Sequence, residues 1–341
     1  MRVSDWSRRG LMGVAGALWA NTALGAETTL AQAAPGALPA PPPIGGKTEI
    51  LKSGVDDANR MTTDVFLDGH GPFPFMVDTG ADHSVVSQEL AAALGLPVRP
   101  MALVHGVAGD VTVPSAFVRD FQVGSRGLQD VALPMLVQAN IGAAGVLGID
   151  VLQGQRVILD FRGRRILISD SPRRRPAADE IVVQARSRFG QLVLVDSSLG
   201  DQTILVVIDT GAESSIANTA FRRRVNPERA SRDGELTSIF SVTGQTTTGA
   251  WAVVPTMQVG GFRLNHVPVV FSDLISFERW RLQNQPALLL GMDVLRLFDT
   301  VEIDFARREV RFAGLHAEEE LPRNAGTTRL AQAGSDPVRR N

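Results

Sequence analysis

The sequence predicts an all-β protein built of two similar lobes with one or two short helices each, and three observations lead to this fold class. The length of 341 residues suits two domains of about 150 residues. The chain contains 33 Gly and 19 Pro, a composition typical of turn-rich β structure. Above all, one series of short motifs occurs twice in the same order.

The charge balance and the absence of cysteine exclude several classes of function. The chain has 34 Lys and Arg against 36 Asp and Glu, so we expect no basic face for nucleic acid. Without cysteine it can form neither disulfides nor thiolate metal sites, and it has no cysteine nucleophile. Its five histidines are scattered, which argues against a histidine-rich metal centre. We therefore expect no metal, no cofactor and no nucleic-acid partner.

Residues 1–33 are predicted to be an export signal of the twin-arginine type. The pair Arg8 and Arg9 precedes a weakly hydrophobic stretch rich in Gly and Ala. That stretch, from Leu11 to Ala26, has sixteen residues, fewer than the roughly 20 that span a bilayer, so we expect no stable membrane anchor. The expected location is periplasmic or extracellular.

Changes in composition divide the rest of the chain. The Ala/Pro-rich segment 34–49 is too poor in large apolar residues to fold and is predicted to be a linker. Lobe 1 is expected over residues 50–170 and lobe 2 over residues 181–316, with an Arg-rich linker at residues 171–180 between them. Residues 317–341 are polar and aperiodic and are predicted to be a disordered tail.

The internal repeat consists of four motifs. Each copy begins with an apolar run that ends in Asp-Thr-Gly-Ala, followed by Gln-Val-Gly, by Leu-Gly-x-Asp-Val-Leu and by an apolar run ending in Asp-Phe. A word such as Asp-Thr-Gly-Ala occurs by chance roughly once in tens of thousands of positions. The paired segments are 75–81 with 206–212, 122–124 with 258–260, 147–152 with 290–295, and 157–161 with 301–305.

The spacing of the motifs supports a duplication. Asp78 and Gly148 are 70 positions apart, whereas Asp209 and Gly291 are 82 positions apart. Five of the twelve extra residues precede the Gln-Val-Gly motif and seven follow it. Because the order is kept, we expect two lobes of one design in which only loops have grown.

Local sequence predicts mostly strands around these motifs. Segments rich in β-branched residues, such as Thr63 to Leu67 and Ile204 to Ile208, are bounded by turn residues. The clearest helix of lobe 1 is expected from Ser87 to Leu94, with Ser87 as its N-cap. Asp150 and Asp293 each precede Val-Leu and are interpreted as caps of short helices rather than as a second acidic pair.

The repeated Asp-Thr-Gly turns are the candidate site. An aspartate directly after a buried strand is costly unless its carboxylate is used. Glycine allows a sharp turn and a close backbone approach, and the threonine hydroxyls can hydrogen-bond across to the opposite turn. A pseudo-twofold axis between the lobes would bring Asp78 and Asp209 side by side. The residues expected to support them are Thr79, Gly80, Thr210 and Gly211.

Two adjacent carboxyl groups predict acid–base catalysis. They cannot both ionise easily, so the pair shares one proton and titrates as a unit. The ionised group can take a proton from a water molecule while the protonated group donates to a carbonyl oxygen. The bond most naturally attacked in this way is a peptide bond, and neither a metal nor a covalent intermediate is required.

From Ile50 to Ala313 the sequence resembles the aspartic proteases of the retropepsin and pepsin type, and it looks like a single-chain tandem of two retropepsin-like units. Alanine follows the glycine in both turns, and Asp82 continues the retropepsin pattern. The resemblance implies the bilobal acid-protease fold, with two pseudo-twofold-related β-barrel-like lobes. It also implies a monomeric aspartic endopeptidase that acts on proteins or peptides through Asp78 and Asp209.

The resemblance further implies two flaps that close over a bound peptide. Val104 to Gly109 looks like a flap hairpin, and Phe240 to Gln245 occupies its place in the second half. The residues implied to bind substrate are Ala81, Asp82, Ala212, Glu213, Gly106, Val107, Ala108, Gly109, Val242, Thr243 and Gly244.

Two departures from the family pattern have consequences. Retropepsins carry an arginine after the glycine of the Leu-Gly motif, where this chain has Ile and Met, so the partners of Asp82 and Glu213 stay open. Pepsins carry a hydroxyl after the glycine of the turn that can donate to an active-site carboxylate, and Ala81 and Ala212 cannot. We therefore expect the pair to titrate higher than in pepsin, with activity at weakly acidic pH.

The sequence leaves two alternatives to an active protease. The chain could be a catalytically silent module that holds peptides in its cleft without cutting them. It could also be a latent protease whose leader or Arg-rich linker must be cut or displaced first.

Overall fold

The structure is a computed structural model of the chain. It describes residues 21–22, 49–56, 60–171, 173–177, 180–188, 191–194, 196–225, 235–315 and 328–329. The predicted export signal, the Ala/Pro-rich linker and the C-terminal tail lie outside the described residues, apart from residues 21–22, 49 and 328–329.

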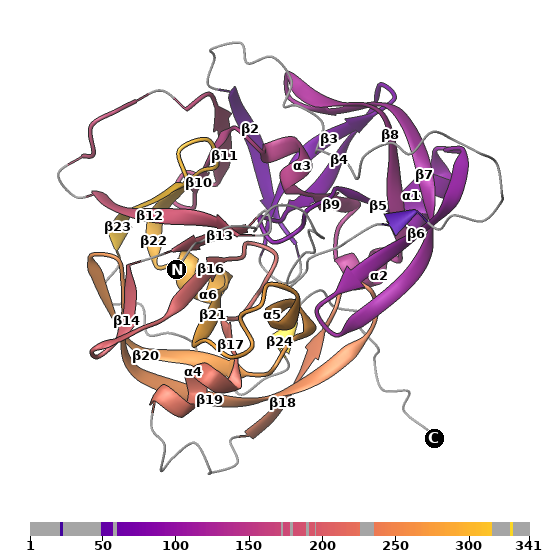
Figure 1. Cartoon of the computed structure of the whole chain (residues 1–341). Coiled ribbons are helices and arrows are strands. Elements are labelled where there is room, and N and C mark those ends of the chain that lie inside the picture. Colours follow the sequence, from indigo (N-terminus) through magenta and orange to yellow (C-terminus); the bar gives the residue numbers. More distant parts are fainter. Residues whose placement is uncertain are drawn as a thin grey trace, which may run out of the picture.

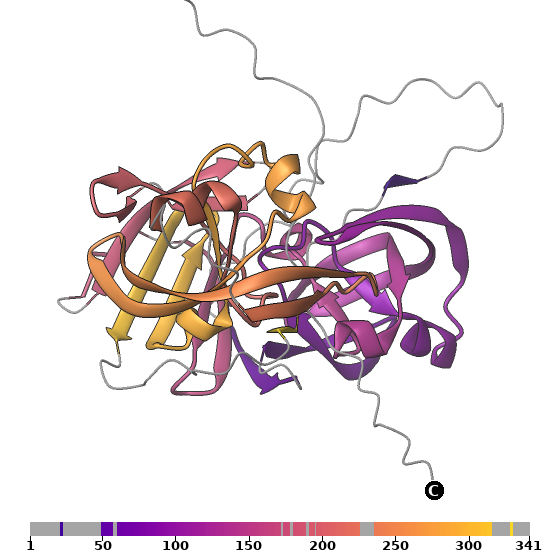
Figure 2. The ribbon, with the colours of Figure 1, turned by 90° about the horizontal axis from the view of Figure 1, so that it is seen from below.

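The described residues form mostly strands in two lobes, which confirms the predicted all-β fold (Figure 1). Figure 2 shows the lobes side by side, with the indigo and magenta elements of lobe 1 next to the orange and yellow elements of lobe 2. Lobe 1 contains β3 (Met61–Leu67), β4 (His70–Val77), β5 (Val85–Ser87), α1 (Gln88–Ala93), β6 (Val98–Gly106), β7 (Gly109–Val123), β8 (Arg126–Leu136), α2 (Gln138–Ile141), β9 (Gly145–Leu147) and α3 (Ile149–Leu152).

Lobe 2 has a matching set of elements. These are β13 (Gln191–Leu194), β14 (Ser197–Leu199), β15 (Gln202–Thr203), β16 (Leu205–Ile208), β17 (Ile216–Ala217), α4 (Thr219–Val225), β18 (Glu235–Phe240), β19 (Thr246–Val259), β20 (Phe262–Phe271), α5 (Ile275–Arg279), β21 (Ala287–Leu290) and α6 (Met292–Leu295). Two short strands from the ends of the chain, β1 (Asn21–Thr22) and β24 (Thr328–Arg329), pair with β6 and β18 respectively.

Both lobes arrange their strands in the same way around the Asp-Thr-Gly turn. In lobe 1, β4 pairs in parallel with β9, β9 pairs antiparallel with β5, and β5 pairs in parallel with β8. In lobe 2, β16, β21, β17 and β20 repeat these pairings in the same order and direction. Each turn therefore begins at the end of a strand that lies beside the strand of the Leu-Gly motif.

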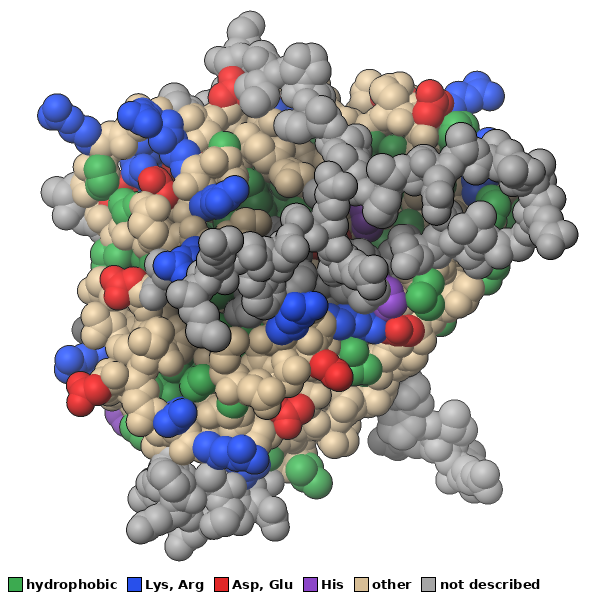
Figure 3. Space-filling view, in the orientation of Figure 1, with side chains coloured by type: hydrophobic (Ala, Val, Ile, Leu, Met, Phe, Trp, Pro, Cys, Tyr) green, Lys and Arg blue, Asp and Glu red, His purple; other side chains and the backbone are tan. Residues whose placement is uncertain are grey.

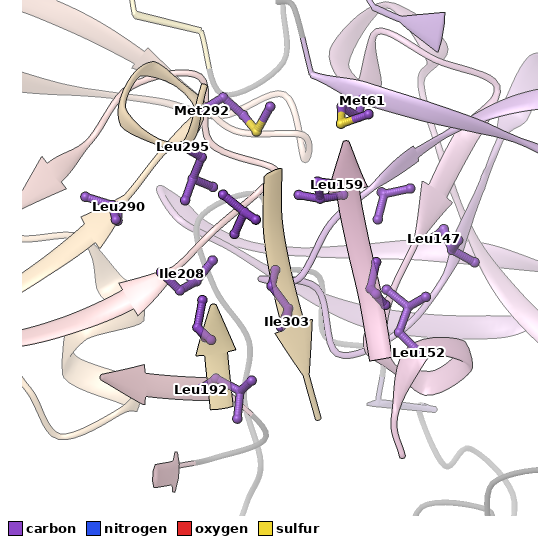
Figure 4. Packing of buried hydrophobic residues seen from close by; sticks show 14 of the residues in the cluster. Met61, Leu147, Leu152, Leu159, Leu192, Ile208, Leu290, Met292, Leu295 and Ile303 are labelled. Carbon is purple, nitrogen blue, oxygen red and sulfur yellow. The ribbon is translucent and has the colours of Figure 1, made fainter. Parts of the chain in front are cut away.

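A six-stranded antiparallel sheet joins the lobes. Its two central strands, β10 (Arg156–Asp160) and β22 (Phe298–Asp304), come from the last motif of each repeat, and Figure 4 shows Leu159 and Ile303 on these neighbouring strands. One hydrophobic cluster runs from lobe 1 through this sheet into lobe 2, which fixes the positions of the two turns relative to each other. The strand order is β2 (Glu49–Val55), β11 (Arg165–Ser169), β10, β22, β23 (Glu309–Leu315) and β12 (Glu180–Arg188).

Helix α1 begins as predicted. Ser87 is its N-cap, and the Ser87 Oγ accepts a hydrogen bond from the Leu90 backbone N–H at 3.1 Å. The helix ends at Ala93 with Leu94 as its C-cap, close to the predicted end. Among the described residues, no helix has both the length and the apolar character needed to cross a membrane.

The seven extra residues that follow the Gln-Val-Gly motif of lobe 2 lie between β20 and β21. This segment contains α5, and Trp280 and Leu282 directly after it are fully buried. The corresponding segment of lobe 1 contains the four-residue helix α2. The expectation that only loops have grown is therefore wrong in this segment, because the added residues extend the hydrophobic core of lobe 2.

Candidate active site

The two aspartates directly follow buried strands. β4 ends one residue before Asp78, and β16 ends one residue before Asp209. The backbone N–H of Asp78 donates to Leu147 O at 3.0 Å, and that of Asp209 donates to Leu290 O at 3.1 Å. The backbone pairing of each sheet thus continues up to the aspartate, and the chain turns immediately afterwards.

The threonines connect the two turns. The backbone N–H of Thr79 donates to Thr210 Oγ1 at 2.9 Å, and the backbone N–H of Thr210 donates to Thr79 Oγ1 at 3.2 Å. The Thr79 hydroxyl donates to Ile208 O at 3.1 Å, and the Thr210 hydroxyl donates to Val77 O at 2.8 Å. Both threonines are buried. The two turns are therefore held together by reciprocal hydrogen bonds of the kind that the sequence suggested.

The carboxyl groups of Asp78 and Asp209 lie next to each other between the turns. The Gly80 N–H donates to Asp78 Oδ1 at 2.7 Å, and the Gly211 N–H donates to Asp209 Oδ1 at 3.0 Å. The two Oδ1 atoms are close neighbours, since a Cβ atom built on Gly80 would lie 3.0 Å from Asp78 Oδ1 and 2.8 Å from Asp209 Oδ1. Both Oδ2 atoms are buried and accept no hydrogen bond from the rest of the described chain.

The two glycines allow each turn to approach the opposite carboxyl group. Neither Gly80 nor Gly211 has a positive φ, so an unusual backbone conformation is not the reason for glycine here. A Cβ atom on Gly80 would lie 2.8 Å from Asp209 Oδ1. A Cβ atom on Gly211 would lie still closer to the Asp78 carboxyl group. Any side chain at these positions would therefore push the two carboxyl groups apart.

Burial raises the pKa of both carboxyl groups. It raises the pKa of Asp78 from 3.8 to about 7. The pKa of Asp209 also lies well above its ordinary value, because the negative charge of Asp78 adds to the effect of burial. Hydrogen bonds from the backbone and the positive charge of Arg60 lower both pKa values and oppose part of this rise. The pair therefore keeps a shared proton in the weakly acidic range.

The strand of the Leu-Gly motif passes close behind each turn. A Cβ atom on Gly148 would lie 2.6 Å from the His83 backbone, and one on Gly291 would lie 2.7 Å from the Ser214 backbone. Only glycine lets the two chain segments approach so closely. The second motif of each lobe thus supports the turn from behind.

The interpretation of Asp150 and Asp293 as helix caps is wrong, because glycine occupies the N-cap position of both α3 and α6. Asp150 instead accepts hydrogen bonds from the Ser84 backbone N–H at 2.8 Å and from the Ser84 hydroxyl at 2.7 Å. Asp293 accepts the same two bonds from Ser215, at 2.9 and 2.7 Å. Each aspartate therefore fastens a short helix to the chain that follows the turn.

Both flap hairpins suggested by the sequence are present. The first is formed by β6 and β7, with Gly106 opposite Gly109. The second is formed by β18 and β19, and the Ser241 N–H donates to Gln245 O across its tip at 2.8 Å. Of the residues implied to bind substrate at the tips, Gly106, Val107 and Val242 are buried, Ala108, Gly109 and Thr243 are half-buried, and Gly244 is exposed.

Each flap inserts a valine into the opposite lobe. Val107 at the tip of the first flap is fully buried in a cluster of lobe 2 that contains Phe277 and Trp280. Val242 at the tip of the second flap is fully buried in a cluster of lobe 1 that contains Val85. The long β18–β19 hairpin reaches toward lobe 1 in Figure 2. The tip of each flap is therefore packed into the opposite lobe.

Charged side chains add to this contact. Asp110, directly after the first flap tip, pairs with Arg279 of α5 and lies 2.9 Å from His105 Nδ1. Gln245 Nε2 from the second flap donates to Asp110 O at 2.9 Å. Although burial acts in the opposite direction, the bonds from His105 and Arg279 hold the pKa of Asp110 below its ordinary value. Sequence reasoning missed this cluster because no local motif connects its members.

The residues after each turn differ between the lobes. Ala81 and Ala212 are fully buried behind the turns. Asp82 is buried, and its Oδ1 accepts a hydrogen bond from Gln191 Nε2 at 3.1 Å, so Gln191 is the partner that the sequence left open. Burial raises the pKa of Asp82 well above its ordinary value. Glu213 is half-buried at the equivalent position of lobe 2.

Arg60 and Gln191 are two site residues that sequence reasoning missed. Arg60 Nη1 in lobe 1 donates to Gly211 O at 3.3 Å, and Gln191 Nε2 in lobe 2 donates to Gly80 O at 3.3 Å. Each lies 18 positions before the aspartate of its own lobe. Extending the internal repeat upstream would have aligned these two positions, although their side chains differ.

Two further observations concern possible metal ligands and the charge on the surface. Within the part of the chain that the structure describes, no three His, Asp or Glu side chains are placed to hold a metal ion. On the face shown in Figure 3, basic and acidic side chains are interspersed, and neither sign forms a continuous surface.

Comparisons with known proteins match both lobes separately. Residues 63–154 match the family model described as "gag-polyprotein putative aspartyl protease", and residues 195–294 match the model described as "Aspartyl protease". Each match includes the Asp-Thr-Gly turn of its lobe and the Leu-Gly pair that begins the third motif. Among solved structures, basic 7S globulin from soybean matches with a TM-score of 0.45 and 11% identity, over 81% of this chain and 99% of that chain. No curated protein matches the sequence.

Proposed function

Because the chain carries two aspartyl protease domains in tandem, we propose that it is an aspartic endopeptidase that hydrolyses peptide bonds with Asp78 and Asp209. One observation carries the proposal. The two carboxyl groups lie side by side between the turns, and the outer oxygen of each, Oδ2, is buried and accepts no hydrogen bond from the described chain. This is the arrangement that general acid–base catalysis by a proton-sharing pair needs.

In the proposed reaction a water molecule lies between the outer oxygens. The ionised carboxylate takes a proton from this water while the water oxygen attacks the carbonyl carbon, and the protonated carboxyl donates its proton to the carbonyl oxygen. The product is a tetrahedral diol. The diol collapses when the pair passes a proton to the amide nitrogen, the C–N bond breaks and a diol hydroxyl returns a proton to the pair. The pair ends the cycle with one proton, as it began.

The remaining residues have supporting roles in this proposal. Thr79 and Thr210 hold the turns together, and the glycines bring the carboxyl groups into contact. The flap tips exclude water from the site once substrate is bound. Both turns belong to one chain, so we propose that a monomer is active.

The test is peptide cleavage by the full chain and by the variants Asp78→Asn and Asp209→Asn. Each variant keeps the shape of the side chain but removes one ionisable group, so we expect cleavage of a peptide library to fall by at least about 10³-fold. Cooperative thermal unfolding measured alongside shows that each variant still folds. Full activity in either variant would refute the proposed mechanism.

A latent or peptide-holding protein is the second candidate, and the buried flap tips favour the latent form. The buried tips of both flaps must leave the opposite lobe before a peptide can enter. If the chain is only a binding module, a statine-type peptide inhibitor will bind while no peptide in the library is cut. If the leader keeps the protease latent, trimming the chain to about residue 50 will raise its activity, whereas equal activity excludes this form of latency.

We also propose that the chain is exported, on the evidence of Arg8 and Arg9 and the apolar stretch that follows them. Residues 1–20 lie outside the described part, so the support is the sequence alone. Changing both arginines to lysine should retain the protein in the cytoplasm in a cell fractionation experiment. Unchanged export of that variant would exclude the twin-arginine route.

A further inference from the structure

A fully buried arginine lies beside the catalytic turns. Arg60 precedes β3 and has no exposed surface, although arginine is almost never buried without partners. Its backbone N–H and Nε donate to Asp56 at 2.8 and 2.7 Å, and its Nη2 donates to Ile141 O at 2.6 Å. Its remaining terminal nitrogen, Nη1, donates to Gly211 O in the turn of lobe 2. The guanidinium therefore reaches from lobe 1 to the turn that carries Asp209.

Gln191 occupies the equivalent place in lobe 2. It begins β13, is buried, and donates to Gly80 O in the turn that carries Asp78. The two side chains thus cross between the lobes, and each supports the turn of the other lobe from the same position in the repeat. They differ in one respect, because arginine carries a positive charge and glutamine does not.

The charge of Arg60 acts on both members of the pair. It lowers the pKa of Asp78 and the pKa of Asp209, in opposition to burial. A neutral side chain that makes the same hydrogen bond would support the turn in the same way, but it would not lower the pKa of the two aspartates. Comparing Arg60 with Gln191 therefore distinguishes two effects. One is the support of a turn by a hydrogen bond, and the other is the stabilisation of the negative charge on the aspartate pair.

We propose that Arg60 is a positioning residue of the active site, which fixes the turn of Asp209 through Gly211 and stabilises the single negative charge that the pair must carry to activate water. Gln191 is its neutral counterpart, which fixes the turn of Asp78 without contributing charge. This inference rests on the proposed function, since it assigns a role in the same site.

Other charged groups near this site form the background against which the role is tested. Apart from Asp56, which one variant changes deliberately, they are the same in every variant described below, so differences between variants report on the Arg60–Asp56 pair and on Gln191. They comprise Asp82 and His83 after the first turn, Glu213 after the second, Asp150 on α3, Asp293 and Arg296 on α6, Asp56 beside Arg60, and His105, Asp110 and Arg279 at the flaps.

The experiment measures titration of the pair in two independent ways across four variants of the full chain. The first readout is the pH profile of kcat/KM on a peptide that the wild type cuts. The second is the titration of the aspartate side chains by carbon-13 NMR, which needs no activity. The variants are Arg60→Gln, which makes both crossed side chains glutamine, Arg60→Lys, Asp56→Asn and Gln191→Leu.

The proposal predicts opposite shifts for the two members of the buried ion pair. Loss of the positive charge in Arg60→Gln should move the titration of the pair, and both limbs of the profile, to higher pH by about one unit. Loss of the neighbouring negative charge in Asp56→Asn should move them to lower pH. Arg60→Lys keeps the charge and should leave the titration in place. Gln191→Leu removes two hydrogen bonds, to Gly80 O and to Asp82 Oδ1, but no charge, so it should reduce the rate without moving either limb.

A purely structural Arg60 gives a different pattern. In that case Arg60→Gln and Asp56→Asn lower stability but leave the titration where it is, or move it in the same direction, and either result overturns the proposal. If Arg60→Gln does not fold, the direction of the shift in Asp56→Asn decides alone. If the wild type cuts no peptide, the proposed function fails, while the NMR titration still decides the role of Arg60.

Discussion

The chemistry of single residues at the turns depends on how closely the two lobes approach. Gly80 and Gly211 are where a backbone of one lobe touches a carboxyl group of the other. The threonines next to them bridge the same gap with hydrogen bonds. An addition of one carbon atom is therefore large on the scale of this site.

Replacing Gly211 with alanine should damage the site more than replacing Gly80. The new Cβ atom in Gly211→Ala would overlap the Asp78 carboxyl group, whereas in Gly80→Ala it would lie 2.8 Å from Asp209 Oδ1. We expect cleavage to fall by at least about 10²-fold in Gly211→Ala, and by less in Gly80→Ala, because catalysis is sensitive to displacements of about 1 Å. Initial rates on one peptide measure both. Equal rates for wild type and Gly211→Ala would contradict the geometry.

The alanines after the glycines set the expected pH range. Burial raises the pKa of Asp78 to about 7, and Ala81 offers no hydroxyl to offset this. We expect the optimum of peptide cleavage at weakly acidic pH, and we expect Ala81→Ser to move it toward lower pH by up to about one unit if the new hydroxyl donates to the pair. The pH profile of kcat/KM measures both. A wild-type optimum as acidic as that of pepsin contradicts the prediction.

At this scale the sequence predicts some residues well and others not at all. Asp78, Asp209 and the threonines stand out because an identical four-residue word occurs twice. Arg60 and Gln191 share only their distance from the turns, since one is a cation and the other an amide. Asp150 was misread because its partner, Ser84, lies 66 positions away and only the folded chain brings the two together.

Among the elements, the flaps depend most clearly on contacts with the opposite lobe. The sequence implies two flap hairpins through its resemblance to the aspartic proteases. It does not predict that their tips are buried in the opposite lobe. The first tip packs against α5 and Trp280 in the longer segment of lobe 2, whereas the second tip packs with Ile141 of the shorter helix α2 in lobe 1.

Truncating the buried tip of the first flap should loosen it. Val107→Ala removes two methyl groups from a fully buried side chain, which should cost the closed flap about 1 to 2 kcal/mol. Amide hydrogen exchange in the tip region of β6 and β7 should then become roughly 5- to 30-fold faster. Val98→Ala is the matched control, because Val98 lies at the start of β6, the strand that leads to the flap tip, and is 68% exposed. Equal exchange in both variants would mean that Val107 does not hold the flap.

On the scale of the whole molecule, burying acidic side chains at the site lowers the stability of the folded chain as the pH rises. The interlobe sheet and the continuous core place two carboxyl groups together away from solvent. Burial also raises the pKa of Asp293 to about 6 and raises the pKa of Asp150 and Asp82. The folded chain therefore binds several protons more tightly than the unfolded chain does.

This difference predicts how stability changes with pH. A carboxyl group whose pKa is raised on folding stabilises the folded state fully below its unfolded pKa, near 4, and the contribution is lost as the pH rises through the folded value. Asp110, Glu180 and Glu309 have lowered pKa values and act in the opposite sense, but their contribution changes at more acidic pH. Between pH 4 and 7 the buried pair should therefore make the wild type less stable as the pH rises.

The double variant Asp78→Asn, Asp209→Asn isolates this contribution, because it keeps the other buried acids. A rise in the pKa of Asp78 from 3.8 to about 7 corresponds to on the order of 4 kcal/mol, so the variant should gain stability relative to the wild type by a few kcal/mol between pH 4 and pH 7. Urea unfolding at a series of pH values measures the difference. Asp201→Asn, at an exposed turn, should follow the wild type at every pH. If the double variant also runs parallel to the wild type, the two aspartates do not share a buried proton, and the site lacks the property on which its chemistry depends.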